Sequence, residues 1–204
     1  MDAETPPPPR LVLRDATRDH HERVEATVDL RSRTRSRDDY RALLASLLGL
    51  HGPFEARLAA LPWAEGGLDF DAHRRVDGLR RDLADLGADP DTVPLADDLP
   101  ALDLLADGFG ALYVLEGSAL GGQIIAREAE AALDLGGVGT RFLRGDGRAP
   151  GRLWRALGRA LDGYLTTPER LDRARRAAEA TFDAFGAWVG PAPPTTQPRR
   201  LDSE

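Results

Sequence analysis

Residues 110–130 have the sequence GALYVLEGSALGGQIIAREAE, a strong helical pattern that contains a cluster of glycines. Gly117, Gly121 and Gly122 lie inside the pattern, and each glycine costs a helix about 1 kcal/mol relative to alanine. One interpretation of the cluster is a helix that bends and brings its backbone against a flat ligand. Close packing against another helix also explains the pattern, and both interpretations remain open here. No strand precedes the glycines, which excludes a dinucleotide or phosphate fingerprint.

On either side of this segment the chain shows helical periodicity and no convincing strand alternation. Helices are predicted over 11–28, from Ser36 onward, over 69–86, 102–133, 151–163 and 168–188. Ser36 and Thr167 are the expected N-caps and Gly87 an expected C-cap, while Pro53 should kink or end the second helix before FEARLAAL. A loop rich in glycine and arginine is expected between 133 and 151. The pattern predicts an all-α, single-domain helical bundle over residues 10–189, with disordered ends at 1–9 and 190–204.

Composition excludes several classes of protein. The chain has 204 residues, no cysteine and a net charge of −7, which excludes disulfide scaffolds and thiolate chemistry and argues against nucleic acid as a partner. All 27 basic residues are arginines, so lysine Schiff-base chemistry is excluded. Glu116 and the glycines interrupt the longest weakly charged stretch, and no targeting segment is visible. We therefore expect a cytoplasmic protein without a membrane span.

A second informative segment is LRDATRDHHERVEATVDL, residues 13–30. On an ideal helical wheel His20 and His21 both border the apolar face. Only His21 has a carboxylate one turn further on, Glu25, and a metal-ligating imidazole usually donates its second N–H to such a group. Arg14 and Arg18 lie on the same flank and could meet an anionic ligand. A surface His–Glu pair is the simpler alternative, but a haem fits a slot between this helix and the glycine helix.

These segments resemble the biliverdin-producing haem oxygenase family. LRDATRDHHERVE (13–25) is similar to the proximal-helix motif of the family, with Thr17, His21 and Glu25 in its register. LYVLEGSALGGQ (112–123) is similar to the distal-helix motif, and TTPERLDRARRAAEATFDAF (166–185) resembles the last core helix. The resemblance covers nearly all of residues 11–188.

The resemblance implies a haem between a proximal helix and a kinked distal helix. It makes His21 the axial iron ligand, and haem both substrate and cofactor. The other residues implied in haem binding are Glu25, Arg14, Thr17, Tyr113 and Phe182, and the implied distal catalytic residues are Gly117, Ser118 and Gly121. Arg18 is a weaker candidate for a propionate contact, and Phe142 occupies a position where the family has an aromatic residue.

Two positions depart from the family pattern. Ser118 stands where many animal-type members have an acid that organises distal water, and serine is uncharged. Around Trp154 and Gly158 the basic propionate contacts of those members are missing. Arg155 and Arg159 are candidate replacements, and neither is assigned.

The implied reaction cleaves haem with dioxygen to biliverdin, carbon monoxide and ferrous iron. Electrons must come from a separate ferredoxin or reductase, because the sequence contains no flavin or nicotinamide motif. A haem carrier or sensor without turnover, and a helical interaction module, are alternatives. A non-haem diiron oxidase is another, for which the i,i+4 pairs His51–Glu55 and His73–Asp77, together with Glu116, supply candidate ligands.

Overall fold

The computed structural model describes residues 7–29, 32–145, 147 and 149–190. Within these residues every regular element is helical, and the prediction of an all-α fold is confirmed. The α-helices are α1 (Pro9–Ala16), α2 (Arg18–Thr27), α3 (Arg37–Ala59), α4 (Val76–Asp85), α5 (Leu105–Leu133), α6 (Arg141–Arg144), α7 (Pro150–Tyr164) and α8 (Pro168–Val189). Short 3₁₀ turns are η1 (Ser32–Thr34), η2 (Trp63–Gly66), η3 (Phe70–His73) and η4 (Pro90–Thr92).

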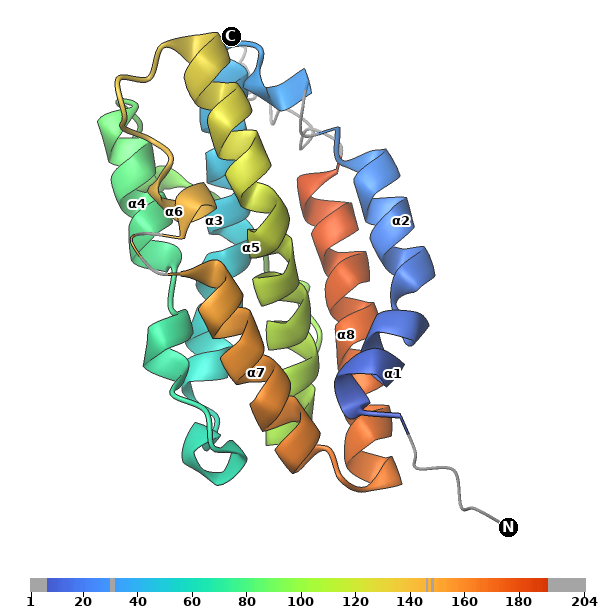
Figure 1. Ribbon diagram of the computed structural model, residues 1–204. Helices are drawn as coiled ribbons and strands as arrows, with labels where there is room; N and C mark the ends of the chain where they lie inside the picture. Colours follow the sequence, from blue (N-terminus) through green and yellow to red (C-terminus); the bar gives the residue numbers. More distant parts are fainter. Residues whose placement is uncertain (1–6, 30–31, 146, 148, 191–204) are drawn as a thin grey trace, which may run out of the picture.

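Helix α5 is the centre of the bundle. It contacts α3, α6, α7 and α8, and α8 in turn contacts α1, α2 and α3. Figure 1 shows α8 lying between α5 and the α1–α2 pair, with α7 on the other side of α5. Gly110 allows α5 and α8 to approach closely, because a side chain there would collide with the carbonyl of Ala174. The largest fully buried side chains are Tyr40, Phe54 and Phe109.

The sequence predicted that Pro53 would kink or end its helix, but the helix does not end there. Helix α3 continues through it to Ala59. A proline cannot donate to the carbonyl four residues earlier, which here belongs to Gly49. That carbonyl instead accepts the backbone N–H of Ala96 at 2.9 Å, so a loop distant in sequence replaces the missing hydrogen bond.

The helix predicted over 11–28 is two helices, α1 and α2, joined at Thr17. The Thr17 hydroxyl donates to the carbonyl of Leu13 at 2.8 Å, an interaction that bends helices. The predicted caps Ser36 and Thr167 are confirmed, since their side chains accept the N–H groups of Asp39 and Arg170.

The region 69–86 and the loop after α5 also differ from expectation. Only Val76–Asp85 is α-helical, because the Glu55 carboxylate accepts the N–H groups of Arg75 and Val76 and fixes the start of α4 there. Gly87 follows α4 in the left-handed conformation, as predicted. The loop contains a short helix, α6, which the sequence pattern did not indicate.

The chain ends bear on the predicted domain limits. Helix α1 begins at Pro9 and α8 ends at Val189, while most of the predicted disordered ends, 1–9 and 190–204, lie outside the described residues. Among those residues one helix, α5, has the length and apolar composition of a membrane span, but it is largely buried inside the bundle. Burial among the other helices identifies α5 as a core helix.

Candidate functional site

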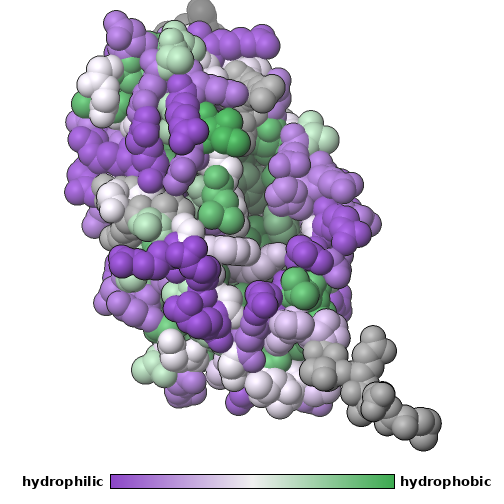
Figure 2. Space-filling view, viewed as in Figure 1, coloured by the Kyte–Doolittle hydropathy of each residue, from purple (hydrophilic) through white to green (hydrophobic). Residues whose placement is uncertain are grey.

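A cavity of about 530 Å³ separates the N-terminal helices from α5. We call it the α2–α5 cavity. Figure 2 shows hydrophobic residues in a hollow between α5 and α2, with hydrophilic residues on both sides. It is lined by Arg14, Thr17, Arg18, His21, Glu22, Val24, Glu25, Val28, Tyr113, Val114, Gly117, Ser118, Leu120, Gly121, Ile125, Trp154, Phe182 and Phe185. The structure therefore brings together all of the site residues predicted from the sequence.

His21 presents an imidazole to this cavity from α2. Its Nδ1 lies 3.6 Å from a carboxylate oxygen of Glu25, and its ring meets that of Phe182 edge to face with centroids 5.8 Å apart. The Nε2 atom forms no hydrogen bond with any residue that the structure describes. This arrangement suits a ligand nitrogen, because the partner of Nδ1 fixes the tautomer that leaves Nε2 free.

His20, one residue earlier, is placed differently. Its Nδ1 lies 2.9 Å from a carboxylate oxygen of Asp183 and 2.8 Å from a guanidinium nitrogen of Arg23. The side chain is outside the α2–α5 cavity. His20 thus joins α2 to α8, and only His21 is available to a ligand in the cavity.

The wall opposite His21 is the glycine segment of α5. Nothing lies within 4 Å of the position that a Cβ would occupy on Gly121, and at Gly117 the nearest neighbour is Trp154 at 3.7 Å. The helix is uninterrupted from Leu105 to Leu133 and changes direction part-way along (Figure 1). The missing side chains leave backbone as the surface of this wall.

Ser118 also lines the cavity, but its proton is already in use. The hydroxyl donates to the carbonyl of Leu115 at 2.8 Å. The oxygen lone pairs remain available, so Ser118 can accept a hydrogen bond from a water or ligand.

Polar groups gather at the α1 end of the cavity. Burial raises the pKa of Tyr113, and hydrogen bonding with Thr17 and the nearby charge of Arg14 oppose this rise. Arg14 and Arg18 each form an ion pair with Asp15, at 3.1 and 2.8 Å. Both guanidinium groups are more than half exposed and can exchange Asp15 for another anion.

Sequence reasoning did not select several lining residues, among them Trp154 and Phe185. Their signal is weak, because each is one apolar position on a helix far away in the sequence. The unassigned Arg155 and Arg159 lie outside the α2–α5 cavity. They line an adjoining pocket of about 350 Å³ that shares Tyr113 and Trp154 with it.

The candidate diiron ligands lie on the opposite face of α5. His51, Glu55, His73 and Glu116 surround a chamber of about 20 Å³, which we call the buried chamber. Arg75 also lines it, and Glu55 is occupied by the start of α4. In the described part of the chain no group of three or more such side chains could hold a metal ion. Asp77 is not part of the chamber, so the ligand set of the diiron alternative is not assembled.

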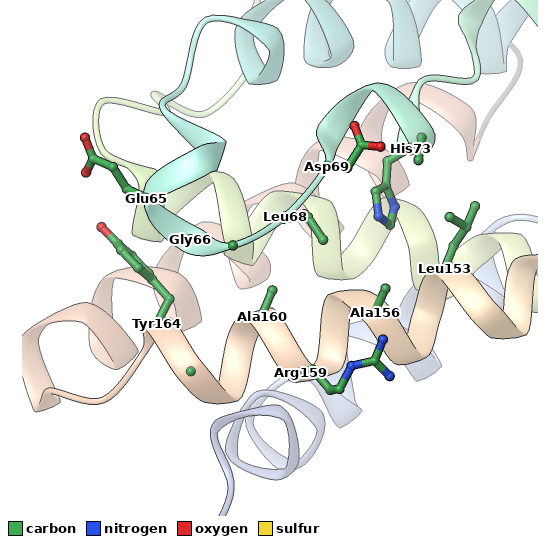
Figure 3. Close-up of a pocket in the computed structure, with 13 residues that line it drawn as sticks. Glu65, Gly66, Leu68, Asp69, His73, Leu153, Ala156, Arg159, Ala160 and Tyr164 are labelled. Atoms are coloured by element: carbon green, nitrogen blue, oxygen red, sulfur yellow. The ribbon is translucent and has the colours of Figure 1, made fainter.

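Near the buried chamber lies an open cleft of about 540 Å³, the α7 cleft, between α7 and residues 65–73. Figure 3 shows small side chains, Ala156 and Ala160, along the α7 side, and the His73 ring directed into the cleft between Leu68 and Leu153. His73 is thus shared by the α7 cleft and the buried chamber.

Comparison with known proteins gives this arrangement its context. A protein-family model described as "Heme oxygenase" matches residues 11–190. The Pseudomonas aeruginosa protein Heme oxygenase PigA is 34% identical over 198 residues, a match that covers 91% of this chain and 96% of that protein. The chain belongs to the haem oxygenase family.

Two solved haem oxygenases share the fold. The enzyme from Neisseria meningitidis, solved with NO and CO bound, has a TM-score of 0.74 at 22% identity over 89% of this chain and 90% of its own. The enzyme from Leptospira interrogans has a TM-score of 0.71 at 18% identity over 90% and 99%. These structures confirm the fold, and the family model together with the Pseudomonas relative confirms the family resemblance seen in the sequence.

The residues of the α2–α5 cavity fit the ligand of a haem oxygenase. One imidazole with a carboxylate partner faces a wall of bare backbone, as a flat macrocycle with a central iron requires. Apolar and aromatic side chains line the space between them, and two arginines lie toward α1, where propionates could be neutralised.

Proposed function

We propose that this chain binds haem in the α2–α5 cavity and opens the ring to biliverdin, carbon monoxide and ferrous iron. The observation that carries the proposal is the opposition of His21 and the side-chain-free Gly121 across one apolar cavity. Bound haem supplies both the iron that binds dioxygen and the carbon that is oxidised.

His21 would hold the iron of a bound haem through Nε2. Glu25, 3.6 Å from Nδ1, accepts the N–H on that side directly or through water, and so leaves the lone pair of Nε2 free for the iron. Phe182 packs edge-on against the imidazole and limits its rotation. Together, His21, Glu25 and Phe182 would orient the bond between the imidazole and the iron.

On the distal side Gly117 and Gly121 would let the α5 backbone approach the face of a bound haem, because neither carries a side chain. Ser118 accepts a hydrogen bond from a water in the cavity, since its own hydroxyl proton is donated to the carbonyl of Leu115. The chain thus positions distal water without placing a charged side chain there.

Arg14 contacts a haem propionate after releasing Asp15, and Arg18 is the second candidate. Thr17 and Tyr113 line the same end of the cavity. Exposed charge pairs stabilise by only about 0–1 kcal/mol, so exchanging a carboxylate of the protein for one of the ligand costs little.

Electrons come from an external donor, a ferredoxin or a reductase, and dioxygen is the second substrate. The expected compartment is the cytoplasm. Among the alternatives, a haem carrier or sensor uses the same cavity without turnover, and the experiment below separates it from the enzyme.

The test is a haem titration of three chains: wild type, His21→Ala and His20→Ala. Wild type and His20→Ala should give the same ferric spectrum, and His21→Ala should lose it, because His20 is held by Asp183 outside the cavity. Reductant is then added in air, and biliverdin and carbon monoxide are measured. Haem that stays intact in the wild type would identify a carrier, and loss of the spectrum in His20→Ala alone would refute the assignment of His21.

A further inference from the structure

Glu116 and His73 form a nearly fully buried pair between α5 and η3. The His73 Nδ1 lies 3.1 Å from a carboxylate oxygen of Glu116, and their side chains are 1% and 2% exposed. Neither side chain lines the α2–α5 cavity, and both lie on the far side of α5 from it.

The position of Glu116 in α5 gives the pair its importance. Glu116 directly precedes Gly117, where the bare wall of the cavity begins. Beyond it, the buried residues of α5 are small until the end of the helix: Ala119, Gly122, Ala126, Ala129 and then Leu133. Small residues contribute no long side chain that reaches into a neighbouring element. Glu116 is the last long side chain that ties α5 to the core before the glycines.

The partner of Glu116 is itself firmly held. His73 ends the η3 turn, where Phe70 stacks on Trp63 with ring centroids 5.1 Å apart and the planes 8° from parallel. Arg74 and Arg75, which follow His73, are bonded to Glu55 of α3. The anchor for Glu116 is therefore part of the framework and does not belong to a free loop.

We propose that His73, acting through Glu116, is a positioning residue. It fixes the distance between the glycine segment of α5 and a haem bound in the α2–α5 cavity. The inference rests on the proposed function for its consequence in catalysis. The contact between His73 and Glu116 is short and buried, and it is made one residue before the wall whose backbone approaches the ligand.

The first test uses the haem-free chain. Amide hydrogen exchange at residues 117–122 is compared in wild type, His73→Leu, Glu116→Leu and the double variant His73→Leu/Glu116→Leu. Replacing both members of a buried polar pair by apolar residues is often neutral for stability, so the double variant should melt near the wild type. Exchange at 117–122 should nevertheless be at least about tenfold faster in it. Wild-type protection in a double variant of wild-type stability would overturn the proposal.

Two further variants distinguish anchoring from a general loss of ion pairs. Asp107 of α5 is paired with Arg173 of α8 at 2.6 Å. Asp107→Asn should lower stability without changing exchange at 117–122, and an equal acceleration there would count against a specific role for His73. Glu116→Gln keeps an acceptor of the same length and should retain most of the protection.

The second test uses haem-loaded protein with carbon monoxide as a probe of the distal wall. The C–O stretch should shift or broaden in the double variant and stay at its wild-type frequency in Asp107→Asn. An unchanged stretch would mean that the pair does not set the wall. If the chain failed to bind haem at all, the proposed function would fall while the exchange result would still decide whether His73 anchors α5.

Discussion

Gly121 and Gly122 are neighbours on α5, yet a side chain added at each meets different surroundings. At Gly121 nothing lies within 4 Å of a Cβ, whereas at Gly122 the carbonyl oxygen of Leu143 is 3.1 Å away. Gly121→Leu should therefore fold and bind haem through His21 but form biliverdin slowly, because the leucine occupies the distal space. Gly122→Leu should lose about 1–3 kcal/mol of stability through overpacking.

Thermal melting by circular dichroism and a biliverdin assay on the same samples test this pair. A stable Gly121→Leu chain with normal turnover would place the reaction away from the glycine wall. A Gly121→Leu chain that unfolds would instead favour the interpretation in which the glycines serve only helix packing.

The two polar clusters differ in how far sequence predicts them. His21 and Glu25 are one turn apart on a single helix, so their contact follows from helical geometry. The contact between His73 and Glu116 joins residues 43 positions apart, and no local pattern indicates it. That His20 lies outside the cavity, bonded to Asp183 of α8, is likewise visible only in the structure.

At the scale of elements, the helices and their caps were predictable because they depend on neighbouring residues. The exceptions have distant causes: Ala96 supports the helix through Pro53, and Asp82 of α4 organises α6. The division of the first helix at Thr17 has a local cause, the hydrogen bond from the Thr17 hydroxyl to the preceding turn. It was not predictable, because such a bond occurs in bent helices as well as in divided ones.

Asp82 provides an element-scale prediction. It is fully buried and accepts the N–H groups of Arg141 and Phe142 at 3.0 and 2.8 Å. Burial raises the pKa of its carboxyl group, and these hydrogen bonds oppose the rise. Asp82→Ala leaves the two donors unpaired and should lower the free energy of unfolding by about 2–4 kcal/mol.

Asp85 is the matched control, because it is exposed and pairs with the same Arg141. Asp85→Ala should cost no more than about 1 kcal/mol. Urea denaturation of both variants measures the difference, and equal losses would show that α6 does not depend on the buried carboxylate.

For the whole molecule, His51 links folding to pH. Burial, aided by the charge of Arg75, lowers the pKa of His51 from 6.5 to about 3. In the unfolded chain the imidazole takes up a proton below about pH 6.5, whereas in the native chain it stays neutral down to about pH 3. Acid therefore favours unfolding, and the stability that His51 contributes is complete above pH 6.5 and is lost on acidification through that window.

Between pH 7 and pH 5 this effect amounts to about 2 kcal/mol of unfolding free energy. A His51→Leu chain lacks the effect and should lose that much less than the wild type over the same interval. Urea denaturation at the two pH values measures the difference, because the other titrating groups contribute equally to both chains. Parallel decline of the two chains would show that His51 is protonated in the native state.

The α2–α5 cavity joins the two ends of the chain, and this affects when during synthesis it can form. Its walls extend from Arg14 to Phe185, and the bond between His20 and Asp183 closes a loop of 163 positions. Helices α1 and α2 are made before α8, the helix that packs against both of them. A nascent chain that lacks α8 should therefore retain haem poorly, and loading should begin only after α8 has been made.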